Sequence, residues 1–316
     1  MREIGGYIEL DRYHLPMLHE GALALNCGRN ALAYLLHARK IKRLWIPRLM
    51  CDSVWKVCER EGVPYSFYRI GIDFRPAEDI QPGENEWIYF VNYYSRFTNE
   101  MLLPYVRQYG HVIVDNAQSY FQRPLDGTDT LYTCRKYFGV ADGAFLYTDA
   151  RLEKPLAVSE SFERMRFLLG RLERSASEFY PDYVRNNDFF ENEPILLMSK
   201  LTDNLLRGID YDFVRKKREE NYGTLQCELD SVNLLPESAT VGTFMYPLYV
   251  DNGPTIRWKL QQTGIYIPTL WADTYKVCEE GATEYRMAEN ILPLPIDQRY
   301  GQDDMKYMAE TVKAFL

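Results

Sequence analysis

The chain has 316 residues, 46% of them hydrophobic and 26% charged, so it can form one large domain or a large and a small one. Its formal net charge of −8 argues against nucleic acid as the main partner, because a protein that binds the phosphate backbone needs a basic surface. The N-terminus lacks the apolar region of a signal peptide, and no run approaches the roughly 18 apolar residues of a membrane span. With six scattered cysteines and no metal-site spacing, we expect a reduced, soluble, cytoplasmic protein that has no membrane partner.

The first half of the chain alternates strand-like and helix-like segments. The short apolar runs are residues 22–25, 44–47, 87–91 and 111–114. Helical patterns follow the first two runs, the second of them over residues 52–60, and another separates the last two at residues 99–109. Short strands that are apolar almost throughout and alternate with helices predict a mostly parallel sheet, sandwiched by helices on both faces. We therefore predict the α/β class.

The pattern changes after residue 149. The chain becomes helix-rich and charged, with a helix predicted over residues 211–225. A β-like segment at 244–250 opens a section that resembles a smaller α+β unit, which a helix over 303–316 closes. We therefore predict a large domain over residues 1–230 and a small C-terminal α+β domain over 231–316.

Three strand ends carry residues suited to binding a ligand, because ligands of parallel α/β sheets gather beyond the carboxyl ends of the strands. The first is the turn Asn26-Cys27-Gly28-Arg29-Asn30, which precedes a predicted helix. The free N–H groups of that helix would bind a phosphate, and Gly28 would let the anion approach the backbone. By itself, a glycine before a helix is more often a simple turn.

The other two strand ends carry an acid and a lysine. Asp115 directly follows a buried strand, where a carboxylate is costly unless it is paired or solvated, although a helix N-cap is the other interpretation. Gln118 would reach towards the same space. Lys136 lies among aromatic residues such as Tyr137 and Phe138, which would desolvate it as a Schiff-base lysine requires. A surface lysine in a loop is the alternative.

The order of these features points to one chemistry. A phosphate-binding glycine turn, an acid after a buried strand and a lysine 21 residues later occur in this order in fold-type I enzymes, which use pyridoxal 5'-phosphate (PLP). The phosphate anchors the cofactor and the lysine holds it covalently. The carboxylate keeps the pyridine nitrogen protonated, so that the ring can accept electrons.

The same segments resemble those of the DegT/DnrJ/EryC1/StrS (sugar) aminotransferase family. Asp115-Asn116-Ala117-Gln118 is similar to the family's E-D-A-A-Q segment, residues 133–144 to its Schiff-base segment and residues 27–32 to its phosphate turn. The resemblance implies an aspartate-aminotransferase-like fold of PLP fold type I. It also implies that Lys136 forms the internal aldimine, that Asp115 contacts the pyridine nitrogen and that Gln118 contacts the ring hydroxyl.

The phosphate turn departs from the family pattern. The resemblance places Gly28, Arg29 and Asn30 at the cofactor phosphate, with Arg29 where the family has threonine; an arginine could strengthen phosphate binding or reach a substrate carboxylate. Leu131 occupies the position of a phosphate-binding serine, and Thr133 or Thr130 would replace that serine.

Further departures affect the ring and the substrate. Cys51 stands where the family commonly places an aromatic residue on the cofactor ring, so either Cys51 packs on the ring or Tyr93 or Tyr94 covers it. Arg299 could bind a substrate carboxylate or phosphate, with a structural ion pair as the alternative. The chain lacks a clear N-Y-R segment, which the family contributes from the neighbouring subunit; Asn192 is the candidate.

The resemblance implies a homodimeric PLP-dependent aminotransferase. Its amino donor would be glutamate or glutamine, and its acceptor a keto-sugar, nucleotide-linked and destined for polysaccharide biosynthesis. Two alternatives stay open. One is a PLP-dependent sugar lyase or dehydratase, which Lys136 disfavours because histidine replaces the lysine in that branch of the family. The other is a non-catalytic relative with a binding or regulatory role.

Overall fold

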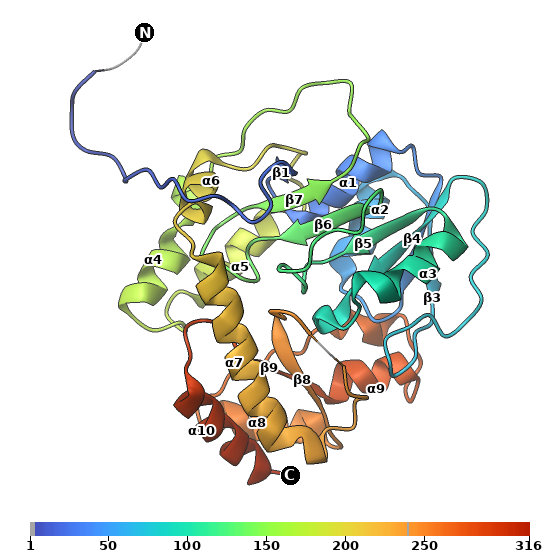
Figure 1. Cartoon of the computed structure of the whole chain (residues 1–316), viewed down its shortest axis with the longest axis vertical. Coiled ribbons are helices and arrows are strands. Elements are labelled where there is room, and N and C mark those ends of the chain that lie inside the picture. The colour runs from blue at the N-terminus through green and yellow to red at the C-terminus, as the bar shows by residue number, and fades with distance from the viewer. Residues whose placement is uncertain (1–3, 239) are drawn as a thin grey trace.

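A seven-stranded sheet forms the centre of the larger part of the molecule (Figure 1). The computed structural model describes residues 4–238 and 240–316. The strands are β1 (Leu23–Leu25), β2 (Arg43–Pro47), β3 (Tyr65–Tyr68), β4 (Glu86–Val91), β5 (Val112–Asp115), β6 (Asp129–Thr133) and β7 (Ala144–Tyr147). They lie in the order β1-β7-β6-β5-β4-β2-β3.

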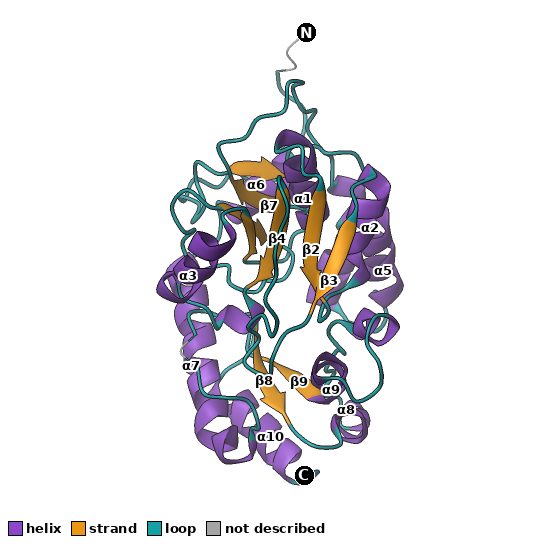
Figure 2. Ribbon diagram, turned by 90° about the vertical axis from the view of Figure 1, so that its right-hand side faces the viewer, coloured by secondary structure: helices purple, strands orange, loops and turns teal. Residues whose placement is uncertain are grey.

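Most of the sheet is parallel. Strands β3, β2, β4, β5 and β6 pair in parallel, whereas β7 is antiparallel to both β6 and β1. Because β7 reverses direction between them, β1 runs the same way as β6, and its carboxyl end reaches the same edge of the sheet. Helices α1 (Gly28–Ala38) and α2 (Asp52–Glu61) lie on one face and α3 (Asn99–Tyr109) on the other (Figure 2). The predicted α/β class and mostly parallel sheet are confirmed.

The side chains explain why these segments pack as they do. Residues 112–115 of β5 are all buried, as expected of a central strand covered on both faces. Helix α1 buries residues 30–36 on all its sides, because it packs against both the sheet and helix α2. Helix α2 ends at Gly62 in the left-handed conformation (φ +68°) that glycine adopts most easily. The core of the larger part lies between the sheet and these helices.

The predicted elements match their counterparts in the structure closely, although the structure also contains strands and helices that were not predicted. The four predicted strands and the helices at 52–60 and 99–109 have counterparts that begin and end within one or two residues. Strand β3 was not predicted, because this edge strand is only half-buried over most of its length and its residues Tyr-Ser-Phe-Tyr show no continuous apolar run.

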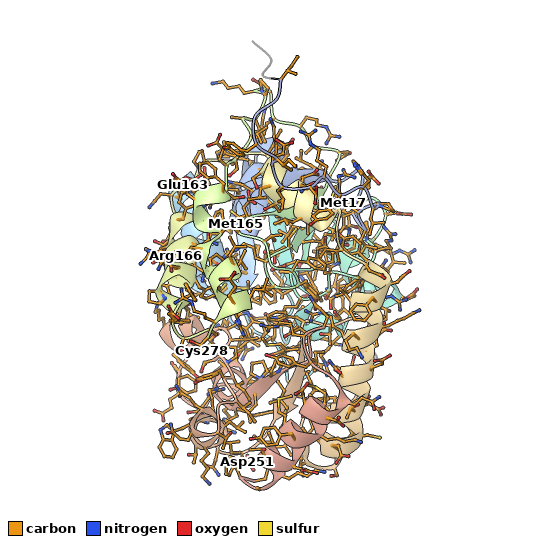
Figure 3. The ribbon with its side chains drawn as sticks, turned by 90° about the vertical axis from the view of Figure 1, so that its left-hand side faces the viewer. Met17, Glu163, Met165, Arg166, Asp251 and Cys278 are labelled. Atoms are coloured by element: carbon orange, nitrogen blue, oxygen red, sulfur yellow. The ribbon has the colours of Figure 1, made fainter. Side chains whose placement is uncertain are left out.

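The remaining chain is mostly helical and adds a small second sheet. Its elements are α4 (Arg166–Glu173), α5 (Tyr180–Phe189), α6 (Lys200–Leu206), α7 (Tyr211–Leu229), β8 (Met245–Tyr249), α8 (Gly253–Gln262), α9 (Thr283–Asn290), β9 (Ile291–Pro295) and α10 (Gln302–Lys313). Short 3-10 helices lie at Tyr93–Ser95, Phe162–Arg164, Asp230–Val232 and Ala272–Lys276. Figure 3 views the side where α4 is at the surface, with Glu163, Met165 and Arg166 labelled near its start.

Strands β8 and β9 form an antiparallel pair with a core of its own. Leu248 and Leu292 from the two strands pack with Met308 of α10 and with Leu225 and Leu229 of α7. Helix α7 runs four residues beyond its predicted end and extends from the larger part into this second core (Figure 1). The predicted division between residues 230 and 231 stays a prediction. None of the described helices is both long and apolar enough to cross a membrane.

His19 makes the folded state sensitive to acid. Its Nε2 donates to the Tyr120 carbonyl (2.8 Å) and its Nδ1 lies 3.2 Å from the Tyr147 hydroxyl. Burial lowers the pKa of His19 to about 4, against the Tyr120 hydrogen bond, while the nearby charge of Arg123 acts in the same direction as burial. The unfolded chain therefore takes up this proton near pH 6.5, but the folded chain takes it up only near pH 4.

We expect the free energy of unfolding to fall by up to about 3 kcal/mol from this group as the pH drops from 7 to 4. Urea unfolding at several pH values would measure it, with His19→Gln losing this share of the pH dependence. His14→Gln, at an exposed position of the N-terminal segment, is the matched control and should behave as the wild type. An unchanged pH profile for His19→Gln would contradict the assignment.

Candidate active site

A cavity of about 270 Å³ lies at the carboxyl edge of the parallel strands. Its walls come from the starts of α1 and α2, the ends of β5 and β6, the turn that follows β6 and the helices α4 and α5. Its volume is just below the range of roughly 300–1,000 Å³ typical of small-molecule sites. Of the residues predicted from the sequence, it brings together Gly28, Arg29, Cys51, Asp115, Thr133 and Lys136.

Asp115 ends β5 as a buried carboxylate with two donors. The Ala117 amide donates to Oδ1 (2.7 Å), and the Tyr89 hydroxyl, from the neighbouring β4, donates to Oδ2 (2.9 Å). Burial raises the pKa of Asp115, whereas the charge of Lys136 and these two hydrogen bonds oppose the rise. The carboxylate is thus fixed in orientation and retains free lone pairs for a cationic or N–H ligand.

Lys136 projects from a tight turn between β6 and β7. The Cys134 carbonyl accepts hydrogen bonds from the amides of Tyr137 (3.0 Å) and Phe138 (2.9 Å), which fixes the turn. The Lys136 Nζ lies 5.6 Å from the centre of the Phe244 ring and makes no ion pair with any described carboxylate. Lys136 is exposed, so the aromatic turn does not bury the lysine as the sequence predicted. Its side chain lines the cavity.

The N-terminus of α1 faces the end of β6. Cys27 precedes the helix without a side-chain cap, so the first N–H groups of α1 keep their capacity for an anion. A Cβ at Gly28 would lie 2.7 Å from Thr133 Cγ2, which explains the glycine by close approach, not by backbone angles. The Thr133 hydroxyl is buried without a partner among the described residues. A phosphate at this position would accept hydrogen bonds from both the first N–H groups of α1 and the Thr133 hydroxyl.

Two predicted cofactor ligands have side chains committed elsewhere. Gln118 accepts a hydrogen bond from the Tyr94 amide (2.8 Å) through Oε1 and does not line the cavity. Asn30 donates to the Pro194 carbonyl (2.7 Å) and accepts from Arg60 (2.9 Å), so its amide holds the chain around residue 194 to α1. The structure does not bring either residue to the cavity wall.

Of the three residues predicted to pack on the cofactor ring, only one lines the cavity. Tyr93 and Tyr94 are buried in the core, where the Tyr93 hydroxyl donates to the Leu49 carbonyl (2.7 Å), and neither lines the cavity. Cys51 does line it and lies 2.7 Å from the Ser53 hydroxyl. Arg299 forms an exposed ion pair with Asp297 (2.6 Å) outside the cavity, as in the alternative interpretation of its sequence.

The cavity also contains residues that the sequence did not identify as site residues. They include Tyr89 on β4, Arg135 beside the lysine, and Tyr183 and Asn187 on α5. Tyr183 and Asn187 are four residues apart, which places both on one face of α5, and this spacing was the available signal. Arg135 could have been singled out because it directly precedes the predicted lysine.

A larger hollow of about 520 Å³ lies elsewhere, between α7 and residues 237, 238, 240, 242 and 243. It is lined by Arg218 and Tyr222 together with the acidic Glu219 and Glu237, and by none of the predicted site residues. We assign the chemistry to the smaller cavity because only there do a lysine, a buried acid and an uncapped helix N-terminus converge.

The close approach of Gly28 and Thr133 gives a stability prediction. Gly28→Ala places a methyl group against a short, branched side chain at the end of a strand, so we expect a loss of about 1–3 kcal/mol of unfolding free energy, measured by denaturant titration. Gly223→Ala is the control: its Cβ would meet nothing within 4 Å in the middle of α7, so it should stabilise the protein by up to about 1 kcal/mol. Equal effects would contradict the packing argument.

Comparisons with known proteins give a structural match only. No protein-family model matches the chain, and neither does any curated protein sequence. The sugar aminotransferase CalS13 from Micromonospora echinospora is 16% identical, with a TM-score of 0.64 over 93% of this chain and 87% of that one. DesV from S. venezuelae is also 16% identical, with a TM-score of 0.65 over 97% and 91%.

A third similar structure is the PLP form of Spr1654 from Streptococcus pneumoniae, which is described as a sugar aminotransferase. It is 12% identical, with a TM-score of 0.61 over 94% of this chain and 88% of that one. All three matches cover nearly the whole of both chains, so the likeness includes the large sheet, the covering helices and the small second sheet. The chain therefore has the fold of the DegT/DnrJ/EryC1/StrS-type sugar aminotransferases.

Proposed function

We propose that this protein is a PLP-dependent aminotransferase in which Lys136 holds the cofactor. The observation that carries the proposal is that Lys136 and Asp115 open onto one cavity, beside the uncapped N-terminus of α1 and the unpaired Thr133 hydroxyl. An amine, a fixed carboxylate and an anion site are the three contacts that PLP requires. The solved structures with this fold include Spr1654 in its PLP and PMP forms, which supports the same cofactor.

The residues that line the cavity suit the amine, the pyridine nitrogen and the phosphate contacts of the cofactor. Lys136 would bind it covalently, Asp115 would face its pyridine nitrogen, and Gly28, Arg29 and Thr133 would hold its phosphate. When bound, PLP supplies an electron sink for chemistry at the carbon that carries the amino group. Cys51 lines the same cavity and is the candidate to pack on the ring.

The protein itself would orient the cofactor and transfer a proton. The Tyr89 hydroxyl and the Ala117 amide keep the Asp115 carboxylate in one orientation, so its charge stays directed into the cavity. Apolar side chains of α4 and of the turn after Lys136, such as Phe167 and Phe138, line part of the cavity. Lys136, when its amine is free, is positioned to accept and return a proton at Nζ as the general base and acid.

We propose a keto-sugar as the amino acceptor and glutamate or glutamine as the donor. The support is the fold, which CalS13 and other sugar aminotransferases share. Of the alternatives, a dehydratase is disfavoured because Lys136 is available in the cavity. A non-catalytic relative would bind the cofactor but transfer no amino group, and the commitment of Gln118 to the Tyr94 amide is the observation in its favour.

Borohydride reduction in the presence of PLP tests the role of Lys136. We expect the wild type to gain one covalent phosphopyridoxyl group on the peptide that contains Lys136, detected by mass spectrometry, and Lys136→Ala to gain none there. Lys154→Ala, at an exposed loop position, should be labelled like the wild type. A wild type that carries no label on Lys136 would refute the proposed function.

The PLP-bound protein also distinguishes an active aminotransferase from a non-catalytic relative that only binds the cofactor. Loss of the cofactor absorbance when glutamate or glutamine is added would support transamination, and Asp115→Asn should slow it by at least about 100-fold, because the ring nitrogen loses its counter-charge. PLP binding without a response to any amino donor would instead favour the non-catalytic alternative.

We also propose that the protein is a homodimer. Helices α4 and α5, which close the cavity, carry exposed apolar side chains on their outer side, among them Leu169, Leu172 and Tyr180; Leu172 is 85% exposed. Exposed apolar groups gathered on neighbouring elements are typical of an interaction surface. A second copy at this face would cover the helices that line the site.

Analytical ultracentrifugation tests this surface. We expect a dimer for the wild type and a large shift towards monomer for Leu172→Glu, because a charge would be buried in the contact. Leu234→Glu, at another exposed leucine outside α4 and α5, is the control and should leave the dimer intact. A monomeric wild type contradicts the dimer, and a dimeric Leu172→Glu contradicts the choice of surface.

A further inference from the structure

Three arginines converge beside the N-terminus of α1. Arg29 lies in the first turn of α1, Arg135 directly precedes the lysine, and Arg164 lies in the segment before α4. The guanidinium groups of Arg135 and Arg164 both lie 5.0 Å from the centre of the Phe190 ring. Within residues 4–238 and 240–316, no carboxylate forms an ion pair with any of the three.

Their hydrogen bonds go to neutral oxygens. Arg29 donates to the Asn187 carbonyl (3.3 Å), Arg135 donates to the side-chain oxygen of Asn187, and Arg164 donates to the Glu160 carbonyl (2.8 Å). The Nε of Arg135 and the Nη1 of Arg164 are buried without a partner among the described residues. The carboxylates of Asp142 and Glu193 oppose the lowering of the Arg164 pKa by burial. Neither forms an ion pair with the three arginines, so the positive charge is held in place and only partly balanced by the described residues.

The electrostatics show how costly this arrangement is without a ligand. Burial lowers the pKa of Arg135 to about 10, and the charges of Arg29 and Arg164 act in the same direction. Nearby Cys27 does not provide the missing anion, because burial raises the pKa of its thiol and keeps it neutral. Like charges at such close range are costly unless a counter-charge joins them.

We propose that Arg135, together with Arg29, binds the phosphate of the cofactor as a dianion, with Arg164 as a third positive charge behind them. This inference rests on the proposed PLP function. Arg29 and Arg135 both line the cavity, whereas Arg164 does not. The guanidinium fork pairs with two phosphate oxygens at once, and the uncapped amides of α1 add the positive end of the helix dipole.

The charge balance favours a phosphate over a substrate carboxylate. A phosphate monoester carries about −1.5 to −2 at pH 7, with three acceptor oxygens, whereas a carboxylate carries −1 with two. Three arginines, the start of α1 and the unpaired Thr133 hydroxyl together suit the larger charge and the larger number of acceptors.

The position of Arg135 also links phosphate binding to the placement of Lys136. Arg135 and Lys136 are consecutive in the turn closed by the Cys134 carbonyl. Their side chains diverge: that of Arg135 reaches Asn187 of α5, and that of Lys136 reaches Phe244. A phosphate bound by Arg135 would thus fix the same turn that presents the lysine amine.

The experiment compares binding of PLP with binding of pyridoxal, which has the aldehyde but no phosphate. We expect Arg135→Gln to raise the Kd for PLP by about 10- to 100-fold, measured by absorbance titration, and to change the Kd for pyridoxal by less than about 2-fold. Arg135→Lys keeps the positive charge but lacks the guanidinium fork, so its Kd for PLP should lie between those of the wild type and Arg135→Gln. Arg107→Gln, which removes an exposed arginine of α3, should match the wild type.

A second measurement, thermal stabilisation by inorganic phosphate, tests the anion site without the lysine adduct. Inorganic phosphate should raise the melting temperature of the PLP-free wild type and of Lys136→Ala, and raise it less in Arg29→Gln and Arg135→Lys. It therefore still applies if Arg135→Gln does not fold. If the arginine variants bind PLP as tightly as the wild type, or lose PLP and pyridoxal equally, the inference is overturned. If the wild type forms no adduct with either aldehyde, the proposed function fails, and the response to phosphate tests the anion site separately.

Discussion

An ionised carboxylate at the end of a buried hydrophobic strand has to be surrounded by donors and a cation, because water does not stabilise it there. Asp115 is 5% exposed and receives its donors from two sides, the Tyr89 hydroxyl on β4 and the Ala117 amide just beyond β5. The nearest cation that lowers its pKa is Lys136, which follows β6. Because β4, β5 and β6 are neighbours in the sheet, the strand order itself assembles donor, acid and amine at one edge.

The opposite charge gathers at the other end of the cavity. Arg29 and Arg135 line it there with no carboxylate partner among the described residues, next to the amides of α1. The cavity therefore has an acidic side at Asp115 and a basic side at the start of α1, where Thr133 lies beside Gly28. A ligand that is cationic at one end and dianionic at the other matches this polarity, and protonated pyridoxal phosphate has that distribution of charge.

The sequence predicted the strand ends well, because each depends on a local pattern: a run of buried apolar residues followed by Asp115, or an aromatic turn around Lys136. Side chains whose partners are distant in the chain were less predictable. Asn30 is held by the Pro194 carbonyl and Arg135 by Asn187, contacts that only the folded chain creates. Gln118 binds the amide of Tyr94, which adopts a left-handed conformation (φ +52°) that a tyrosine rarely adopts and no motif announces.

The second part of the chain contributes to the site through the lysine turn. Gln298 donates to the Tyr137 carbonyl (2.9 Å), and the buried guanidinium of Arg218 lies 4.5 Å from the centre of the Tyr137 ring. Phe244, next to β8, lies against the Lys136 amine. Three contacts from beyond α6 thus converge on two consecutive residues of the larger part. A shift of the small sheet relative to the large one would therefore reach Lys136 first, so the placement of the amine depends on both parts of the chain.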